Sequence, residues 1–448
     1  MRPQNIAVIG SGISGLSAAW LLDKAHNVTL FEKNDRLGGH TNTFEMDING
    51  NTVPVDTGFI CFNSVCYPNL IAFFDHLSVP QHETSMSFAA SLNGGAYEYS
   101  GGTYLGLFGQ PANFFKPAHW LMIRDILRFF KEAPLALDTL SETESLGAYL
   151  KRAGYSPAFA ERHLLPMAAA IWSSKLTNTL KHPAKAFIQF FQNHGLLQVA
   201  NRPRWGTVDG GSQIYIDRIL DVSNIDYQTS CPVLNVKRLP SHVEVTTQLG
   251  TQQFDHVIFA SHADQALSLL DQPSLREQSL LGAFDYTKNT AVLHQDRRLM
   301  PKRKVTWASW NYLDFAPKGQ SAATSTSDLC LTYWMNSLQN LNTKEDVFVT
   351  LNPPEDIEIE NIAAEFEYTH PVFDGKAMIA QKDLWSLQGV NRTWFCGAHF
   401  GSGFHEDGLQ SGLAVAEQLG GVRRPWTVEN ESGRIFIHEP EGFREAAE

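Results

Sequence analysis

The hydrophobic pattern is clearest near the N-terminus, where residues 6–9 form a continuous apolar run. A run of this length is typical of a strand buried in a parallel sheet. It leads through a glycine-rich turn at residues 10–15 into an apolar helical segment at residues 16–22, and a second apolar run at residues 27–31 ends on Glu32. This order of strand, glycine turn, helix, strand and acid, with the acid about 20 residues past the turn, predicts a dinucleotide-binding α/β fold. The acid in such a fold can accept hydrogen bonds from a ribose diol.

Each glycine of the turn has a separate physical role. Gly10 permits the tight turn, Gly12 lets the backbone approach a pyrophosphate, and Gly15 lets helix and strand pack closely. The start of the helix offers unpaired N–H groups and the positive end of the helix dipole to phosphates.

The rest of the chain predicts further helices and strands. Helical patterns occur at residues 67–77, 111–131, 145–154, 157–163, 165–172, 183–191 and 213–220. Strand patterns occur within residues 81–99 and at residues 231–236, 243–247, 254–260, 290–294, 305–310, 330–335, 347–351 and 393–398. We expect the helical stretch at residues 135–192 and the β-rich stretch at residues 264–379 to belong to a substrate domain.

Residues 111–131 combine bulky apolar side chains with basic ones. One interpretation is an amphipathic helix that touches a membrane surface or gates a channel for a hydrophobic substrate. The other is a helix that packs its apolar stripe on the protein's own core, which is the more common arrangement.

Composition narrows the class of protein. At 448 residues the chain is long enough for two domains and a large core. The net charge of -12 and the lack of a long basic run argue against a nucleic acid partner. The five cysteines are odd in number and scattered, which suits reduced thiols better than disulfides. Cys61 and Cys66 have no second pair to complete a metal site, so we expect no metal.

The same pattern bears on localisation. The first predicted strand begins by residue 6, which leaves no room for a cleavable signal sequence. No uninterrupted apolar stretch reaches the roughly 18 residues of a membrane-spanning helix. We therefore expect a soluble, cytoplasmic protein. Any contact with a bilayer is expected to be peripheral.

The residues after Glu32 bear on which dinucleotide is bound. Residues 36–39 are Arg-Leu-Gly-Gly, and they resemble the R-x-G-G element of the flavin-containing amine oxidase and phytoene desaturase superfamily. This resemblance implies FAD, because the glycine pair lets the chain pass close to the pyrophosphate and ribityl chain. It also implies that residues 56–60 are the superfamily's D-x-G segment beside the flavin ring.

The resemblance implies a fold class and a domain division. The expected fold is α/β, with an FAD-binding Rossmann-like domain of the glutathione-reductase type and an inserted α+β substrate domain. We expect an FAD-binding domain at residues 1–63, 196–264 and 380–421, a substrate domain at residues 64–195 and 265–379, and a C-terminal tail at residues 422–448. The tail is polar and is expected to be an extended arm without identifiable chemistry.

Near its end the chain is expected to return to the cofactor. Residues 393–398 form a strand that runs into glycine, and residues 405–412 resemble the superfamily's C-terminal FAD motif, whose helix start points at the flavin pyrimidine. Many relatives have an acid where this chain has Ala398, so a ribitol or phosphate contact is in question. Glu406 and Asp407 are the candidates to replace it.

The residues expected to bind FAD come from all of these segments. Two later strands, at residues 231–236 and 254–260, resemble those that place Val233 and Ala260 near the adenosine half. The expected contacts are Gly10, Gly12, Ile13, Ser14, Gly15, Glu32, Lys33, Arg36, Gly38, Gly39, His40, Thr41, Thr57, Gly58, Phe59, Ile60, Val233, Ala260, Gly397, Ala398, Glu406, Gly408 and Leu409.

The resemblance extends from residue 6 to about residue 419 and includes a branch of NAD/FAD-binding oxidoreductases. The segments that mark the branch are residues 37–43, 166–173 and 403–408. Members of this branch are often associated with cyclopropane-type fatty acid methyltransferases. The resemblance therefore implies a lipid acyl substrate and a functional link to a lipid methyltransferase.

A single dinucleotide fingerprint gives no sign of a separate NAD(P)H domain, so we expect hydride transfer from substrate to flavin N5. The first hypothesis is dehydrogenation or desaturation of a hydrophobic, lipid-like substrate. The alternative is an amine oxidase that uses the same FAD site, with Lys288 as the candidate for the lysine that relatives bridge through water to flavin N5. His405 is a candidate acid or base, or a residue that hydrogen-bonds a loop. A third hypothesis is a flavoprotein that binds or senses without turnover.

Overall fold

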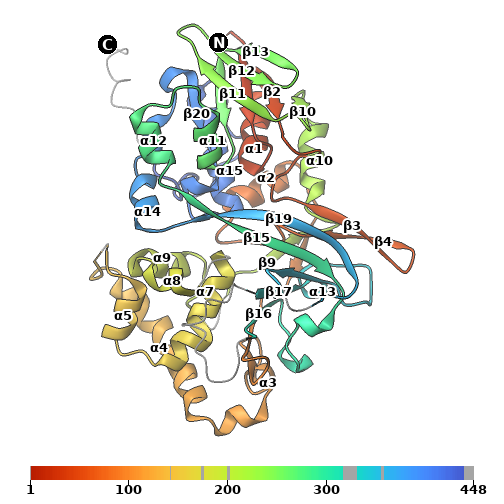
Figure 1. The fold of residues 1–448 in the computed structure, drawn as a ribbon, viewed down its shortest axis with the longest axis vertical. Coiled ribbons are helices and arrows are strands. Elements are labelled where there is room, and N and C mark those ends of the chain that lie inside the picture. The colour runs from red at the N-terminus through yellow and green to blue at the C-terminus, as the bar shows by residue number, and fades with distance from the viewer. Residues whose placement is uncertain are drawn as a thin grey trace.

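The computed structural model describes residues 2–141, 143–172, 176–198, 202–315, 330–354 and 358–437. These residues form a mixed α/β fold with several sheets (Figure 1). A parallel sheet and its helices occupy the upper half of Figure 1, and the helices from α4 (Pro117–Ala136) to α9 (Ala184–Asn193) occupy the lower left. Two long paired strands, β15 (Asp285–His294) and β19 (Ile362–Val372), cross between the halves.

A five-stranded parallel sheet carries the predicted dinucleotide fold. Its order is β10 (Asp226–Gln228), β2 (Asn27–Phe31), β1 (Asn5–Ile9), β14 (His256–Phe259) and β20 (Thr393–Phe395). Val8 lies opposite Leu30 on one side and Ile258 on the other, and all neighbouring pairs are parallel. Three separate stretches of the chain thus meet in one sheet, while the domain boundaries given above stay predictions.

The helix after the glycine turn, α1 (Ile13–Leu22), is buried along its whole length. It packs against α15 (His405–Leu419), and the approach is so close that a Cβ on Gly412 would meet the carbonyl oxygen of Ser14 and Ser17 Oγ. Fully burying one leucine such as Leu16 contributes about 1.5–3 kcal/mol, so this helix pair is a major part of the core.

A seven-stranded mixed sheet forms the β-rich part of the second half. Its order is β19, β15, β18 (Phe348–Leu351), β17 (Cys330–Trp334), β16 (Trp310–Leu313), β7 (Phe88–Leu92) and β8 (Tyr97–Ser100). Only the β16–β7 pairing is parallel among the described strands of this sheet.

The helical part has its own hydrophobic core, built around Phe129, Phe159, Phe187 and Phe191. Its other elements are α5 (Leu146–Arg152), α6 (Pro157–Phe159), a π-helical turn η2 (Ala160–Leu164), α7 (Leu165–Trp172), α8 (Leu176–Lys181) and α9 (Ala184–Asn193). The predicted segment at residues 165–173 is therefore a helix as far as it is described, and its last residue lies outside the described residues.

Shorter elements connect these parts. The small sheets comprise β3 (Thr43–Ile48) with β4 (Asn51–Asp56), β5 (Phe62–Asn63) and β6 (Gln81–Thr84) with β9 (Trp205–Val208), and β11 (Val233–Arg238), β12 (Val243–Thr247) and β13 (Gly250–Phe254). The remaining helices include α2 (Pro68–His76), α3 (Tyr104–Leu107), η1 (Pro111–Phe115), α10 (Gln213–Asp221), α11 (Ala263–Leu269), α12 (Leu275–Leu281), η4 (Lys304–Thr306), α13 (Met335–Leu338), α14 (Gly375–Gln381) and η7 (Ala398–Phe400).

Most predicted elements are confirmed, but residues 305–310 are not a strand. A turn forms at η4, in which Thr306 Oγ1 donates to the Arg303 carbonyl oxygen at 2.7 Å, and the strand starts only at Trp310. The pattern also missed β19, because its residues are mostly half-buried or exposed and show no clear period of two.

The expected extended arm is wrong for residues 422–437. Arg424 is 2% exposed, and it donates to both carboxylate oxygens of Glu417 and to Asn69 Oδ1. Ile435 joins the main hydrophobic core. Local polarity hid this packing, because the buried partners lie far away in the sequence. Residues 438–448 lie outside the described residues.

Within the described ranges, no helix combines the length and the apolar character that crossing a bilayer requires. All five cysteines are free thiols.

Candidate active site

The glycine turn after β1 has open space where a dinucleotide needs it. Gly10 has a φ of +103°, and a Cβ there would lie 2.8 Å from the Ala260 carbonyl oxygen, so only glycine fits. A Cβ on Gly15 would collide with the Gly10 carbonyl oxygen. A Cβ on Gly12, by contrast, would meet no atom within 4 Å. Backbone facing open space at the start of a buried helix is suited to a pyrophosphate.

Glu32 reaches the glycine turn from the end of β2. Its Oε2 accepts hydrogen bonds from the N–H of Ser11 at 3.0 Å and from the Ser11 hydroxyl at 2.5 Å, and its Oε1 accepts from the Asn34 N–H at 2.9 Å. The carboxylate is therefore fixed beside the turn, as a ribose acceptor would be. Lys33 is exposed, and its predicted contact with FAD stays a prediction.

The second glycine element lies directly on the first. The Gly38 N–H donates to the Ser11 carbonyl oxygen at 3.0 Å, and a Cβ on Gly39 would lie 3.2 Å from Gly12 Cα. The Arg36 guanidinium holds this loop by donating to two of its carbonyl oxygens, each at 2.9 Å. Two motifs that are separate in sequence thus form one cradle.

The predicted D-x-G segment packs on the same loop. The Phe59 N–H donates to the His40 carbonyl oxygen at 2.8 Å, and a Cβ on Gly58 would collide with that oxygen. The Thr57 hydroxyl lies 2.8 Å from the hydroxyl of Tyr368, which comes from β19. Ile60 is buried beside these residues. The segment therefore joins the glycine cradle to the seven-stranded sheet.

Asp56 at the start of this segment serves the fold. Its carboxylate accepts from the Ser212 N–H at 2.9 and 3.0 Å, from the Ser212 hydroxyl at 2.7 Å, from Thr43 Oγ1 at 2.6 Å and from Gln339 Nε2 at 2.8 Å. Burial raises its pKa to about 6, although the Thr43 and Ser212 hydrogen bonds oppose the rise. These contacts tie the D-x-G segment to the start of α10, to β3 and to the end of α13.

His405, the first residue of α15, lies in a closed network of side chains. Its ring stacks on Phe59 with centroids 3.8 Å apart. Its Nε2 lies 3.0 Å from the Tyr215 hydroxyl and 3.2 Å from Thr41 Oγ1, and these two oxygens are 2.5 Å apart. Burial lowers the pKa of His405 to about 3, so the ring is neutral at pH 7. A ring with so low a pKa is a weak base, which favours a hydrogen-bonding role.

Further buried histidines surround the cradle. The His40 ring lies 5.1 Å from the rings of both His370 and Tyr368, measured between centroids. His262 stacks on Tyr286 with centroids 4.4 Å apart. Burial lowers the pKa of His40 and of His262 to about 4, and that of His370 to about 3. The strands β15 and β19 thus place neutral side chains against the cofactor half.

Two of these buried rings have an unused nitrogen. In the described part of the chain, Nε2 of His40 and Nε2 of His399 are buried and have no hydrogen-bond partner. A buried polar atom left unpaired costs about 1–3 kcal/mol, so each marks a place that a polar ligand can satisfy. Together with the open space at Gly12, these atoms show that the residues present fit a dinucleotide such as FAD. No three His, Cys, Asp or Glu side chains among the described residues are arranged to hold a metal ion.

The C-terminal motif meets the first glycine turn. A Cβ on Gly408 would lie 2.8 Å from both Ile13 Cγ2 and Ser14 Oγ, so the first turns of α15 and α1 touch. The Gly397 N–H donates to Ser411 Oγ at 3.0 Å, which ties the end of β20 to α15. Ala398 and Leu409 lie in the same junction, and Leu409 is fully buried. Two helix starts therefore present positive dipole ends to one region.

The carboxylate of Glu406 faces another part of the protein. It accepts from the N–H groups of Asn69 at 3.1 Å and Leu70 at 2.9 Å, which open α2, and from Gln410 Nε2 at 2.9 Å. Asp407 is likewise engaged, accepting from the Phe404 N–H at 2.8 Å. This placement does not support the expectation that either acid replaces the one missing at Ala398.

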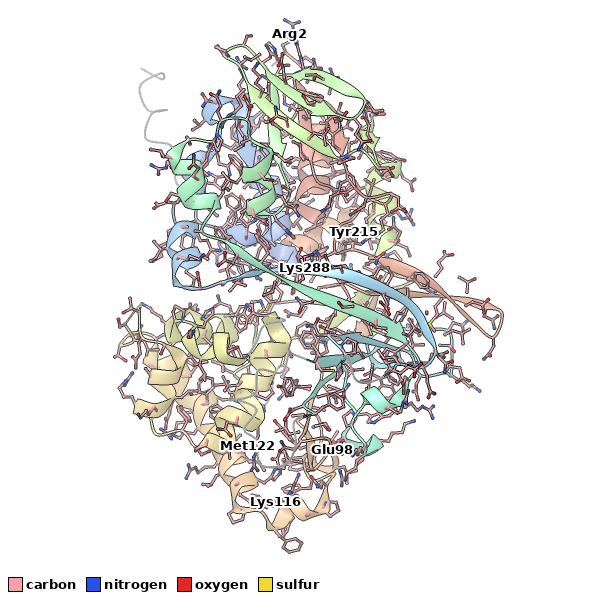
Figure 2. All side chains as sticks on the ribbon, viewed as in Figure 1. Arg2, Glu98, Lys116, Met122, Tyr215 and Lys288 are labelled. Atoms are coloured by element: carbon pink, nitrogen blue, oxygen red, sulfur yellow. The ribbon has the colours of Figure 1, made fainter. Side chains whose placement is uncertain are left out.

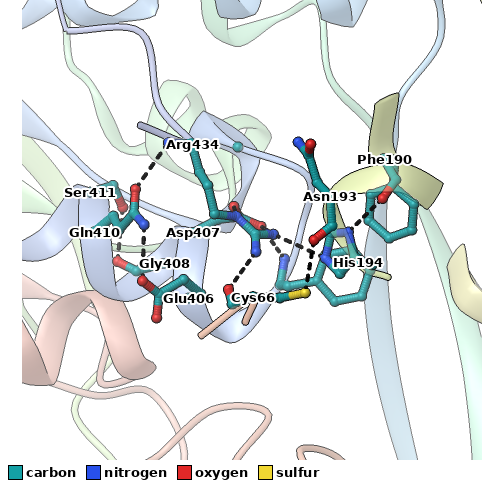
Figure 3. A network of polar contacts seen from close by, with 12 residues as sticks. Cys66, Phe190, Asn193, His194, Glu406, Asp407, Gly408, Gln410, Ser411 and Arg434 are labelled. Carbon is teal, nitrogen blue, oxygen red and sulfur yellow. Dashed lines mark hydrogen bonds and ion pairs between the residues drawn. The ribbon is translucent and has the colours of Figure 1, made fainter. Parts of the chain in front are cut away.

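The C-terminal segment closes over the start of α15 (Figure 3). Arg434 donates to the Asp407 carboxylate at 2.6 and 3.1 Å and to the Cys66 carbonyl oxygen at 2.8 Å, and it reaches His194 Nε2 on the helical part at 3.5 Å. Burial raises the pKa of Asp407, and Arg434 opposes that rise. Arg434 therefore joins the cofactor half, the tail and the helical part.

The remaining predicted residues lie elsewhere. Lys288 on β15 is paired with Glu367 at 3.1 Å, and its side chain is 73% exposed, so the geometry brings no lysine from this position to the buried network (Figure 2). Val233 begins β11 and is buried. Two residues earlier in the chain, the Cys231 N–H donates to the Glu32 carbonyl oxygen at 2.9 Å. Its position is consistent with the adenosine end, and its contact stays a prediction.

Sequence reasoning missed several residues of the site. Tyr215, Tyr368, His370 and Arg434 lie in segments whose local pattern gave no sign of chemistry. The one usable signal is the glycine pair at residues 210–211 before α10, because in the flavoprotein superfamily that the sequence resembles, such a pair commonly opens a helix that returns to the FAD domain.

Comparison with known proteins agrees with this geometry. A family model described as flavin containing amine oxidoreductase matches residues 13–341. An L-amino-acid oxidase from Notechis scutatus scutatus is 47% identical over 50 residues, which are 11% of this chain and 10% of that protein. The chain thus matches only about a tenth of the length of such curated relatives.

Solved structures show the same fold over nearly the whole chain. A putrescine oxidase bound to putrescine has a TM-score of 0.67 at 15% identity, covering 93% of this chain and 99% of that one. A CLA-producing fatty acid isomerase from P. acnes has a TM-score of 0.65 at 13% identity, covering 94% of this chain and 98% of that one. At these identities the likeness concerns the fold alone.

Proposed function

The chain belongs to the flavin-containing amine oxidoreductase family, and from this premise we propose that it is an FAD-dependent enzyme that dehydrogenates or desaturates a hydrophobic, lipid-like substrate by hydride transfer to flavin N5. The cofactor is FAD, which supplies the hydride acceptor when bound. The parallel sheet with its glycine cradle supports the narrower proposal of a Rossmann-like domain of the glutathione-reductase type.

The residues that would hold FAD are those of the cradle. Gly12 and Gly39 leave room for the pyrophosphate, Glu32 is fixed at the position of a ribose acceptor, and the unpaired His40 Nε2 offers a further polar contact. The starts of α1 and α15 add two helix dipoles of the sign that stabilises negative charge. These groups are positioned before any ligand binds, which is how a site avoids reorganisation.

The main support for an uncharged, lipid-like substrate is the absence of unpaired charge in the described part of the site. The histidines around the cradle are neutral at pH 7, because burial lowers the pKa of His40 to about 4 and those of His370 and His405 to about 3. The buried carboxylates of Asp56 and Asp407 are held by protein donors. A cationic amine would find no free carboxylate among these residues, whereas an uncharged acyl chain needs none.

Amine oxidation by the same site is the second candidate. The local identity with L-amino-acid oxidases favours it. The exposed position of Lys288 and its pairing with Glu367 count against the lysine proposed for that chemistry. The fold does not decide, since a fatty acid isomerase has it as well. A functional link to a lipid methyltransferase is part of the first proposal and rests on the branch-marking segments alone.

The experiment is anaerobic reduction of the bound flavin. The purified holoprotein is mixed with free fatty acids, with phospholipid vesicles, and with a panel of primary amines and L-amino acids, and the oxidised flavin absorption is followed. Bleaching by the lipid arm with release of an unsaturated product, seen by mass spectrometry, supports the proposal. Bleaching by amines alone establishes the second candidate, and no bleaching by any arm supports a flavoprotein without turnover.

A further inference from the structure

A group of large apolar side chains is exposed at one end of the molecule. Figure 2 places Lys116 at the opposite end of the long axis from Arg2, and the exposed side chains surround Lys116 on α3, η1 and the start of α4. We call this group the apolar tip, and it consists of Tyr104, Leu105, Phe114, Phe115, Trp120 and Leu121. Three of them are more than three-quarters exposed: Tyr104 at 88%, Leu105 at 76% and Phe115 at 82%.

The apolar tip is an ordered cluster of rings. Phe114 contacts Phe115 and Trp120, with ring centroids 5.4 and 5.6 Å apart, and Trp120 also contacts Phe108 at 5.2 Å. The indole N–H of Trp120 donates to the Phe114 carbonyl oxygen at 2.8 Å. Since the polar atom of the indole is already satisfied and the rings brace one another, the outward surface is preformed and apolar.

The core does not need these side chains. On α4 the inward face of Met122, Phe129 and Ala133 is buried, while Leu127 on the outward face is 53% exposed. Both sequence interpretations of this segment thus apply to different faces of one helix. An exposed apolar patch of this kind marks a contact with a partner or a membrane.

Basic side chains from two separate segments border the tip. Residues 103–132 contain four basic and two acidic residues, and Arg124 and Arg128 are each paired with one of these acids, at 2.8 Å in both cases. The second segment is η4, which packs beside α3 so closely that a Cβ on Gly109 would lie 2.9 Å from Val305. The exposed Lys304 opens this segment, and the exposed Lys302 lies two residues before it. This basic border stands on a chain whose net charge is -12.

We propose that the apolar tip docks on an anionic phospholipid bilayer, with its rings at the acyl boundary and the surrounding lysines and arginines at the headgroups. A convex end of aromatic and leucine side chains with a basic border matches the requirements of interfacial binding. A second copy of the chain fits less well, because two tips would bring like charges together. The inference goes beyond the proposed function and does not depend on it.

The experiment is co-sedimentation of the holoprotein with vesicles of phosphatidylcholine alone and with added phosphatidylglycerol. Leu105→Ser combined with Phe115→Ser removes two side chains that make little contact with the core. We expect the partition coefficient on phosphatidylglycerol vesicles to fall by about tenfold or more. The matched control, Leu249→Ser with Leu275→Ser, removes leucines that are 79% and 84% exposed elsewhere and is expected to leave binding unchanged.

Charge is tested separately. Lys302→Gln with Lys304→Gln is expected to weaken binding to phosphatidylglycerol vesicles by about tenfold or more and to leave binding to pure phosphatidylcholine unchanged, because each basic group near an anionic surface contributes on the order of 1 kcal/mol. Lys237→Gln with Lys344→Gln is the control. Thermal melting confirms that each variant is folded.

Several results overturn the proposal. The proposal is wrong if the wild-type protein fails to sediment with phosphatidylglycerol vesicles. It is also wrong if the tip variants and their controls lose binding equally. The same holds if light scattering shows a dimer that Leu105→Ser with Phe115→Ser converts to a monomer, since the tip is then a contact between copies of this chain.

Discussion

Arg434 forms a bidentate ion pair with Asp407, with donor–acceptor distances of 2.6 and 3.1 Å, although 27 residues separate them. Asp407 lies in the first turn of α15, and that turn touches the first turn of α1 through Gly408. The ion pair therefore connects a segment that looked like a polar tail to the edge of the cofactor site (Figure 3).

Replacing Arg434 by methionine is expected to be costly. The Asp407 side chain has no exposed surface, so the substitution leaves a buried carboxylate without its cation, which typically costs about 3–5 kcal/mol. The urea midpoint and the dissociation constant for FAD measure the effect on the fold and on the site. Arg423→Gln is the control, because Arg423 is 53% exposed and its ion pairs are worth under about 1 kcal/mol. Equal losses in the two variants would contradict this account.

The two kinds of glycine in the first turn are expected to respond differently to alanine. A methyl group on Gly12 meets no protein atom, so Gly12→Ala should keep the melting temperature of the apoprotein while weakening FAD binding by about tenfold or more. A methyl group on Gly15 collides with the Gly10 carbonyl oxygen, so Gly15→Ala should destabilise the fold itself. Gly375→Ala, which also meets no atom and lies at the start of α14, should change neither quantity. Normal FAD affinity in Gly12→Ala would place the pyrophosphate elsewhere.

His405 is expected to act through hydrogen bonds. General base catalysis typically contributes about 10²–10⁴-fold, whereas His405→Gln, which keeps a polar group near Tyr215, should slow flavin reduction by less than about tenfold. Burial lowers the pKa of His405 to about 3, so the pH profile of the wild-type rate should show no step from this residue between about pH 6 and pH 8. The measurement is single-turnover reduction across that range. A step near pH 6.5 that disappears in His405→Gln would show that the residue is a base.

The sequence predicted the parts of the site that depend on local pattern. The glycine turn and Glu32 were found because strand, turn and helix periods are properties of neighbouring residues, and the Gly38–Gly39 loop was found through its resemblance to the R-x-G-G element. The structure brings them into one cradle. Tyr368 and Arg434 were missed for the opposite reason. Their partners, Thr57 and Asp407, lie 311 and 27 residues away, and no local pattern records such a pairing.

The geometry gives no support to two expectations that took residue type without its surroundings. Lys288 has the chemistry of an amine oxidase lysine, but its side chain is exposed on β15. There it forms an ion pair with Glu367 of the neighbouring strand β19. Glu406 has the charge that Ala398 lacks. However, the first turn of α2 supplies two N–H donors, and these orient the Glu406 carboxylate toward α2. In both cases long-range packing decided the role.

Acidification is expected to destabilise the protein from about pH 6.5 downward. Burial lowers the pKa to between about 3 and about 4 in a set of histidines: His40, His163, His194, His262, His294, His370, His399 and His405. In the unfolded chain these rings titrate near 6.5, so between that pH and the folded pKa the unfolded state binds more protons. The stabilisation is fully present above pH 6.5 and is lost as pH falls, by roughly 1.4 kcal/mol per pH unit for each ring that stays neutral.

Urea denaturation of the apoprotein at a series of pH values between about 8 and 5 measures this slope. His294→Gln removes one buried ring from the seven-stranded sheet, outside the proposed cofactor site, and should reduce the slope by roughly 1.4 kcal/mol per pH unit. His82→Gln, at an exposed position on β6, should leave the slope unchanged. If the wild-type free energy of unfolding is constant from about pH 7 to 5.5, these histidines take up protons equally in the folded and the unfolded protein, and burial does not lower their pKa values. The site histidines would then not be held neutral by burial, and they would no longer support an uncharged substrate.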